Sequence, residues 1–160
     1  MEQREKKRLL WVLRSAPHEI EDLIADLASD VYNWRPLPHK WSIVEVMCHL
    51  RDLEGEVYQD RYRRYLAEDN PYFPRADQDA MAAERDYINQ DIHAALARFK
   101  QLRGDNVRFL ESVPLDGWLR PGIHFSAGPM TMEQMVARQS DHDLKHLIQM
   151  KDIARLKMPW

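Results

Sequence analysis

Apolar residues recur every third or fourth position along most of this 160-residue chain. That spacing puts them on one side of an α-helix, which must then be buried against another element. The pattern covers four principal stretches separated by proline-rich connections, so it predicts an all-α fold, a four-helix bundle. A chain of this length buries a sufficient core without covalent cross-links, and we expect one domain spanning residues 1–160.

Prolines and capping residues predict where the helices of the first half begin and end. A first helical region covers residues 9–27, in which Pro17 is expected to interrupt the helix or to begin a second, short one. The tract YNWRPLPHK (32–40) contains two prolines and no periodicity, so it predicts a connection. Ser42 and Glu45 then match the S-x-x-E capping box, in which each side chain satisfies a free backbone N–H at a helix start.

Two more helices are predicted in the second half of the chain. The double-proline tract 68–77 ends the second helix, and a third is expected over residues 78–113. Such a helix would exceed about 50 Å, so we expect Gly104 to bend or break it. The segment 114–130 holds three prolines and three glycines and is expected to be a long irregular loop of functional importance. Thr131 then begins a second capping box and the last helix.

Composition excludes several classes of function. The formal net charge is −3, so no basic field attracts nucleic acid or anionic lipid, and the basic run RYRR (61–64) is expected to lie on a solvated helix face. The five glycines do not cluster into a phosphate-binding loop. No stretch approaches the ~20 apolar residues of a membrane-spanning helix. The single cysteine, Cys48, excludes an internal disulfide, is expected to be buried, and fits a cytoplasmic protein.

His142 and His146 stand four residues apart in the last predicted helix, within QSDHDLKHLIQM. Their Cβ atoms are then about 5–6 Å apart on one face, close enough for both imidazoles to bind one metal ion. Such a pair alone is more often exposed or hydrogen-bonded than ligating. His49 is the candidate third ligand, because it borders the apolar stripe of the second helix, where a histidine must be hydrogen-bonded or coordinated. Three protein nitrogens would leave positions open for water or substrate, as in catalytic metal sites.

Three further residues are candidates for a catalytic role beside this metal site. Glu45 and Asp52 flank His49 at positions i−4 and i+3, where a carboxylate could orient the imidazole ring. Asp52 is preferred because Glu45 also serves the capping box, and solvated carboxylates remain the alternative for both. His124 lies in the loop before the last helix, where we expect it either to overhang the metal or to face solvent. His18, His39 and His93 are expected at the surface.

Three motifs resemble those of a known family. The second-helix motif KWSIVEVMCHLRDLE (40–54), its approach NWRPLPHKWS (33–42) and the final-helix motif TMEQMVARQSDHDLKHLIQM (131–150) are similar to the signatures of the DinB-like proteins, damage-inducible metal-binding bundles. The family's motif histidines map onto His49, His142 and His146. The resemblance implies an up-down-down-up four-helix bundle, often dimeric, that binds zinc or nickel through these side chains. Related members include bacillithiol-dependent thiol S-transferases, mycothiol-dependent isomerases and hydrolases.

Two functions are consistent with these residues. The first is a metal-dependent enzyme, in which a divalent ion activates water or a low-molecular-weight thiol cosubstrate against a small electrophilic molecule, giving a hydrolase or a thiol S-transferase. The second is a non-catalytic metal-binding stress-response protein or a dimeric scaffold. Either could form a homodimer, for which the tryptophans Trp11, Trp34, Trp118 and Trp160 are available. The histidine set by itself suits zinc, nickel, iron or copper, and no nucleic-acid or membrane partner is expected.

Overall fold

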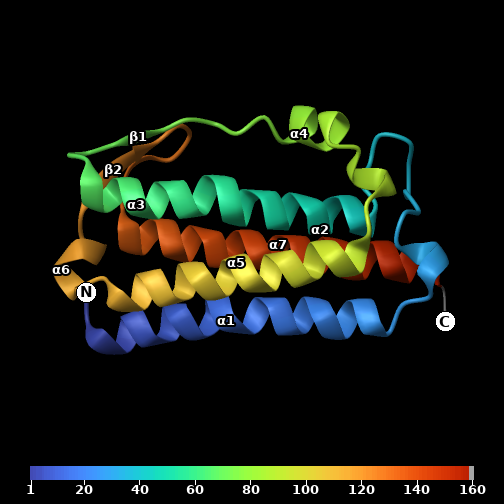
Figure 1. The fold of residues 1–160 in the computed structure, drawn as a ribbon, viewed down its shortest axis with the longest axis horizontal. Coiled ribbons are helices and arrows are strands. Elements are labelled where there is room, and N and C mark those ends of the chain that lie inside the picture. Colours follow the sequence, from blue (N-terminus) through green and yellow to red (C-terminus); the bar gives the residue numbers. More distant parts are fainter. Residues whose placement is uncertain (159–160) are drawn as a thin grey trace.

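The computed structural model describes residues 1–158 and confirms a four-helix bundle. The four long helical segments lie side by side (Figure 1). They are α1 (Gln3–Ala25); the continuous segment of α2 (Ile43–Asp52), the π-helix η2 (Leu53–Tyr58) and α3 (Gln59–Ala67); α5 (Ile92–Ser112); and α7 (Met132–Lys157). The first and last run in one direction and the middle two in the other (Figure 1), which is the up-down-down-up order that the resemblance implied. Among the described residues, none of the helices is long and apolar enough to cross a membrane.

Shorter elements connect the long helices. They are η1 (Ser29–Val31), β1 (Tyr72–Phe73), α4 (Gln78–Glu84), η3 (Tyr87–Asn89), α6 (Leu115–Trp118), β2 (Pro121–His124) and β3 (Gly128–Thr131). The segment from β1 through α4 returns along the outside of α2 and α3 (Figure 1), which allows α5 to run in the same direction as the segment before it.

Both predicted capping boxes are present. The Ser42 hydroxyl accepts a hydrogen bond from the Glu45 backbone N–H, and the Glu45 carboxylate accepts one from the Ser42 backbone N–H at 2.8 Å. Thr131 and Gln134 make the equivalent pair at the start of α7. These caps fix the first residues of the two helices that carry the candidate metal ligands.

The prediction that Pro17 interrupts the first helix is wrong, because α1 continues through it. Proline cannot donate to the carbonyl four residues earlier, here that of Leu13. Arg103 of α5 donates to this carbonyl instead, at 2.8 Å. A buried side chain from a neighbouring helix therefore satisfies the acceptor that the proline leaves free, and the helix does not need to end.

The predicted third helix is divided, but its break does not fall at Gly104. The chain leaves α4 at Asp86, which has a left-handed backbone conformation with φ of 49°. A new helix, α5, then begins after Asp91, whose carboxylate accepts hydrogen bonds from the His93 and Ala94 backbone N–H groups. The turn at Asp86 and the new helix cap at Asp91 determine where the helix is divided, whereas Gly104 lies inside α5.

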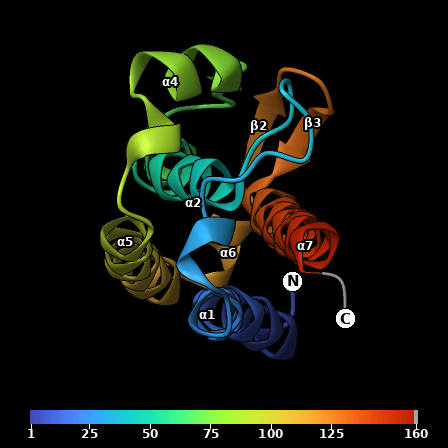
Figure 2. The same cartoon turned by 90° about the vertical axis from the view of Figure 1, so that its right-hand side faces the viewer.

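The predicted irregular segment 114–130 is largely ordered into secondary structure. It contains α6 and the antiparallel pair β2–β3, and β1 from the tract 68–77 joins β2 in parallel. Gly122 permits this sheet, since a Cβ there would lie 2.6 Å from a ring carbon of Phe73 and 2.8 Å from one of Tyr65. The β2–β3 hairpin lies beside α3 (Figure 1), where the Tyr65 hydroxyl donates to the Met130 carbonyl at 3.1 Å, and β3 leads into α7 (Figure 2).

The interior consists of two apolar clusters. One joins α2, the first half of α5 and the second half of α7, and includes Ile43, Met47, Phe99 and Met150. The other joins the N-terminal half of α1 with α3, α6 and the start of α7, and includes Leu13, Tyr62, Trp118 and Met135. Buried polar residues on α2, η2, α5 and α7 belong to neither cluster: His49, Glu54, Arg103, Asn106, Gln139, Asp143 and His146.

Several expectations about exposure are confirmed and others are wrong. Cys48 is buried, and His18, His39 and His93 are exposed, as expected. The run RYRR is not a solvated face, because Arg61 and Tyr62 are buried. Their position on α3 turns them toward the second apolar cluster, while the next residue in the run faces solvent.

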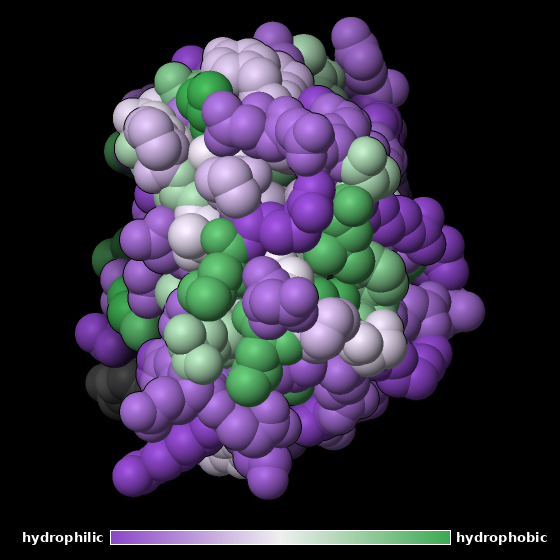
Figure 3. All heavy atoms as spheres, turned by 90° about the vertical axis from the view of Figure 1, so that its left-hand side faces the viewer, coloured by the Kyte–Doolittle hydropathy of each residue, from purple (hydrophilic) through white to green (hydrophobic). Residues whose placement is uncertain are grey.

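The tryptophans do not form one exposed surface. Trp11 is 67% exposed on α1, but Trp118 is fully buried, so its predicted role in a dimer interface is wrong. Trp34 is half-buried against the first apolar cluster, and Trp160 lies outside the described residues. At the end of the bundle that carries α6 and the strands, hydrophobic side chains reach the surface in separate groups among charged ones (Figure 3).

Candidate metal centre

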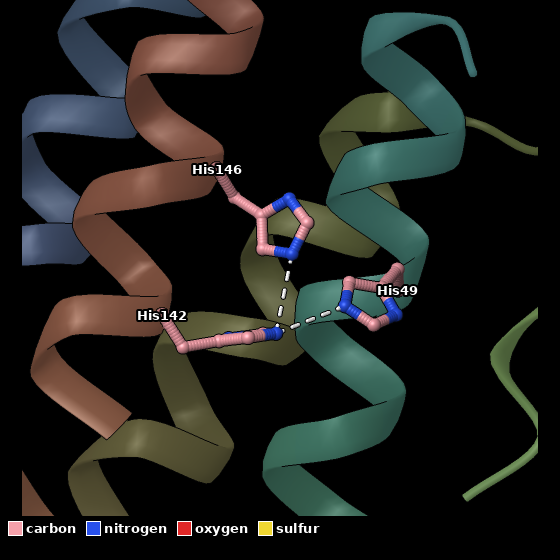
Figure 4. A group of neighbouring side chains, drawn as sticks. All are labelled: His49, His142 and His146. Carbon is pink, nitrogen blue, oxygen red and sulfur yellow. Dashed lines mark hydrogen bonds between the residues drawn. The ribbon is translucent and has the colours of Figure 1, made fainter. Parts of the chain in front are cut away.

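Three histidines from two helices converge inside the bundle. His49 projects from α2 and His142 and His146 from α7, with their rings turned toward one another (Figure 4). The Nε2 atoms of His49 and His146 each lie 3.2 Å from Nε2 of His142. One ligand atom from each residue lies within 4.8 Å of the other two, and no fourth His, Cys, Asp or Glu in residues 1–158 joins the group. The structure therefore brings together the three residues predicted as ligands.

The geometry of the donor atoms suits a small divalent cation. Metal–nitrogen bonds of about 2.0–2.1 Å in tetrahedral geometry separate neighbouring ligand atoms by roughly 3.3 Å. The two Nε2–Nε2 separations of 3.2 Å are close to this value. Three imidazole nitrogens suit zinc, nickel and other first-row metals. The residues present therefore fit a metal ion and provide three of its ligands.

Burial keeps the three imidazoles in the neutral form that a metal requires. It lowers the pKa of His49 to about 3, and the nearby His146 adds to this effect. Burial is also the largest cause of the lowered pKa values of His142 and His146. The indole of Trp41 packs 5.0 Å from the His49 ring and the Tyr58 ring 6.1 Å from that of His142, between ring centroids. These aromatic side chains help to exclude water, so the ring nitrogens keep free lone pairs near neutral pH.

A hydrogen bond fixes the tautomer of His146. Its Nδ1 lies 2.7 Å from the side-chain oxygen of Gln149, which can only accept. Nδ1 therefore carries the proton, and the Nε2 lone pair faces the other two histidines. His142 differs, because its buried Nδ1 has no hydrogen-bond partner within the described part of the chain.

A buried ionic network lies against the metal centre, and the sequence analysis missed it. Arg103 pairs with Glu54 of η2 and with Asp143 of α7, both at 2.8 Å. Asn106 and Gln139 donate to the Glu54 carboxylate at 2.8 and 2.6 Å. The available signal was Asn106, a polar residue in the apolar stripe of the third predicted helix. Since Asp143 follows His142 directly, the network ties the part of α7 that carries the candidate ligands to α5 and η2.

The two carboxylates proposed to orient His49 form their hydrogen bonds elsewhere. Glu45 pairs with Arg35 and with Ser42, and these bonds lower its pKa although burial alone would raise it. Asp52 accepts from Arg51 at 2.6 Å and also from Arg85 and Tyr87, which likewise outweigh burial and lower its pKa. Among the described residues neither carboxylate is hydrogen-bonded to the three histidines.

His124 is neither in a loop nor exposed. It ends β2 with 3% of its surface exposed and is not part of the three-histidine group. Its Nδ1 accepts hydrogen bonds from the backbone N–H groups of Ser126 and Ala127, each at 3.3 Å. Because Nδ1 accepts, the neutral ring carries its proton on Nε2 and is a hydrogen-bond donor there.

Comparisons with known proteins agree with this fold. A model of the DinB superfamily matches residues 13–150. Among solved structures, YfiT from Bacillus subtilis superposes with a TM-score of 0.88 at 20% sequence identity, over 100% of this chain and 91% of that chain. YfiT is described as a probable metal-dependent hydrolase with an unusual four-helix bundle topology. The comparison with curated proteins found no match. The family model matches most of this chain and confirms the resemblance carried by the helix motifs. The chain therefore belongs to the DinB superfamily.

Proposed function

We propose that this protein is a metal-dependent enzyme that promotes attack of water or a thiol on a small electrophilic molecule. The observation that carries the proposal is the convergence of nitrogens from three histidines, two buried and one half-buried, without a fourth protein ligand in the described residues. A structural metal site is normally closed by four protein ligands, whereas a catalytic site keeps a position open. The similar protein YfiT, described as a probable metal-dependent hydrolase, supports the hydrolytic form of the reaction.

The chain's own residues hold the ligands in place for this chemistry. When bound, a divalent ion such as zinc or nickel supplies Lewis acidity and lowers the pKa of a water or thiol that reaches it. Gln149 keeps the His146 lone pair directed at the centre, and the Arg103 ion pairs hold α7 against η2. A thiol cosubstrate would need a reducing compartment, so we place the activity in the cytoplasm, which also suits the single buried Cys48.

The first experiment measures metal content together with activity. Purified protein is expected to hold about one divalent ion per chain, and His142→Ala is expected to lose it. Model esters, amides and alkylating electrophiles are then tested with and without added thiol and chelator. Turnover without thiol identifies a hydrolase, and turnover that requires thiol identifies a transferase.

The matched control is His93→Ala, which changes an exposed histidine on α5 and should keep both metal and activity. Metal-replete protein that binds no ion, or binds it with a fourth protein ligand closing the coordination sphere, would contradict the proposal. That second result would favour a non-catalytic metal-binding protein.

A further inference from the structure

Arg61 is a buried cation without an acidic partner. Only 7% of its surface is exposed, and no carboxylate in the described part of the chain forms an ion pair with it. Its guanidinium donates to the Pro74 carbonyl at 3.0 Å and lies 3.9 Å from the Met135 sulfur. The rings of Tyr58 and Phe73 flank it at 6.0 and 5.8 Å. A guanidinium has five N–H donors, and within the described residues only two of its nitrogens have a protein partner.

Arg103 shows how this protein neutralises a buried arginine that serves only structure. It is 2% exposed, and two carboxylates and a backbone carbonyl surround it. Removing a charge from water is costly, and this protein offsets the cost for Arg103 with opposite charges. Arg61 lacks that compensation. A buried, unpaired guanidinium is expected where an anion binds during function.

Two further basic side chains act on the same region. His124 pairs with Phe73 between β1 and β2, and the Phe73 ring lies 5.8 Å from the Arg61 guanidinium. Arg138 follows Met135, whose sulfur Arg61 contacts, by three residues on the same face of α7. The charges of both arginines accordingly lower the pKa of His124, after the larger effect of burial. Arg138 is exposed on α7, so one member of this group lies at the surface. His124 adds a neutral donor, its Nε2–H, because its Nδ1 accepts backbone hydrogen bonds. We call Arg61, Arg138 and His124 the basic cluster.

The basic cluster and the metal centre share a neighbour. The Tyr58 ring lies 6.1 Å from the His142 ring and 6.0 Å from the Arg61 guanidinium. Arg138 precedes His142 by four residues, so both project from the same face of α7. The two places are therefore close enough for one small molecule to span them.

We propose that the basic cluster binds an anionic group, a carboxylate or phosphate, of the small molecule that reacts at the metal centre. This inference rests on the proposed function and names its substrate class: an electrophile or thiol with an anionic group several bonds from the reacting atom. Bidentate hydrogen bonds from Arg61 would fix the orientation of the reactant, and Arg138 would attract it from solvent.

The first test uses inorganic phosphate and metal-free protein, so that it does not depend on the metal. Phosphate is expected to raise the unfolding temperature of the wild type through binding to the native state. Arg61→Met should abolish this increase without lowering the unfolding temperature in phosphate-free buffer, because methionine keeps the apolar contacts and removes an unpaired charge. Arg63→Gln, an exposed arginine on the same helix, is the matched control and should respond like the wild type.

Arg138→Gln is the second variant, and because Arg138 is exposed this change removes little packing. It should weaken phosphate binding while leaving the phosphate-free unfolding temperature unchanged. An equal phosphate effect in the wild type, Arg61→Met and Arg138→Gln would overturn the proposal. A loss of stability of Arg61→Met in phosphate-free buffer, together with normal phosphate binding by Arg138→Gln, would also overturn it. That result would identify Arg61 as a purely structural arginine.

A second test asks which reactant carries the anion. Mercaptohexanoate and mercaptohexanol are titrated into cobalt-loaded protein, where the thiolate-to-cobalt absorption band reports binding. Tighter binding of mercaptohexanoate by about tenfold or more, lost in Arg61→Met, assigns the anionic group to a thiol cosubstrate. Equal binding of the two thiols, with phosphate still bound through Arg61, assigns it to the electrophile. If cobalt does not bind at all, the proposed function fails, while the metal-free phosphate result still decides the basic cluster.

Discussion

The histidines of this protein differ in their chemistry because their hydrogen-bond partners differ. Burial lowers the pKa of His49 and His146 so that both present lone pairs to a common point, and a single acceptor, Gln149, decides which nitrogen of His146 does so. His124 is equally buried, yet its accepting Nδ1 makes it a donor through Nε2. Each role follows from the partner of one ring nitrogen, which the residue's identity alone does not determine.

The titration of His124 predicts a pH dependence of stability. Burial, with the charges of Arg61 and Arg138, lowers its pKa from 6.5 to about 4 in the folded protein. As the pH falls below 6.5, the unfolded chain takes up a proton that the native state refuses until about pH 4. The free energy of unfolding should therefore fall with decreasing pH across this window, by less than about 1.4 kcal/mol per pH unit for this one group.

Urea unfolding of metal-free protein between pH 7 and pH 4 measures this contribution. The histidines of the metal centre have the same sign, so the informative quantity is the difference between the wild type and His124→Asn. Asparagine can still accept the backbone hydrogen bonds through its side-chain oxygen but does not titrate. A shallower pH dependence in the variant is expected, and identical slopes would show that His124 does not resist protonation.

The ligand residues could be predicted from the sequence, but their partners could not. Helix periodicity places His142 and His146 on one face, and the position of His49 beside an apolar stripe made it the third candidate. The family motifs then pointed to the same three residues. Glu45 is hydrogen-bonded to Arg35, and Asp52 to Arg85. Both arginines come from segments whose path depends on the whole fold. Local spacing says which side chains share a helix face, and it contains no information about which distant side chain will meet them.

At the scale of elements, the π-helix η2 determines what lies beside the metal centre. It joins α2 to α3 and buries Leu53, Glu54 and Tyr58. Wider turns of this kind are frequent at functional sites. Here the turn directs Glu54 to Arg103 and places Tyr58 between His142 and Arg61. An uninterrupted α-helix was predicted for this region, because apolar spacing does not distinguish one widened turn.

Arg103 contacts three other elements of the bundle, and its replacement should strongly lower the free energy of unfolding. It bonds to α1 through the Leu13 carbonyl, to η2 through Glu54 and to α7 through Asp143. Arg103→Met would leave two carboxylates buried without their cation, and we expect the free energy of unfolding to fall by about 3–5 kcal/mol. Urea unfolding at neutral pH measures the change.

The control for this variant is Arg108→Met on the same helix. The Arg108 side chain is 71% exposed and pairs with the nearby Asp105, so its loss should change the free energy of unfolding by no more than about 0.5 kcal/mol. A similarly small effect of Arg103→Met would mean that the network contributes no net stability.

Element boundaries were predictable where local signals decide them. The capping boxes at Ser42 and Thr131 were found correctly because both partners lie within one turn of sequence. The prediction of a break at Pro17 was wrong because Arg103, which donates to the free carbonyl, is distant in sequence. The strands were missed because β1 and β2 pair across an intervening helical segment, which leaves no local pattern in either tract.

At the scale of the whole molecule, the candidate metal centre and the Arg103 network lie between two apolar clusters. Stability comes mainly from those clusters, one on each side of the buried histidines and the Arg103 network. The candidate metal centre lies on α2 and α7, and the basic cluster combines Arg138 of α7 with Arg61 of α3 and His124 of β2. A change in the packing of either end should leave the ligands together, because the capping boxes and the ion pairs fix them locally.

The outer surface of α1 and α7 leads us to expect a homodimer. Trp11 is 67% exposed and Leu144 55% exposed, and both line a groove of about 220 Å³ between the two helices. In a two-fold dimer the same patch meets itself, so the exposed tryptophan of one copy can enter the groove of the other. Light scattering after size-exclusion chromatography should give twice the chain mass of 19.1 kDa.

Leu144→Lys tests whether this face forms the dimer. A charge in the centre of the contact should produce monomers, because an unpaired ammonium would have to lose its water there. Leu156→Lys is the control, since Leu156 is 66% exposed near the end of the same helix and outside the groove. The monomeric variant should keep its metal, because all three ligands come from one chain. A wild type that is monomeric at micromolar concentration, or a Leu144→Lys variant that remains dimeric, would contradict this interface.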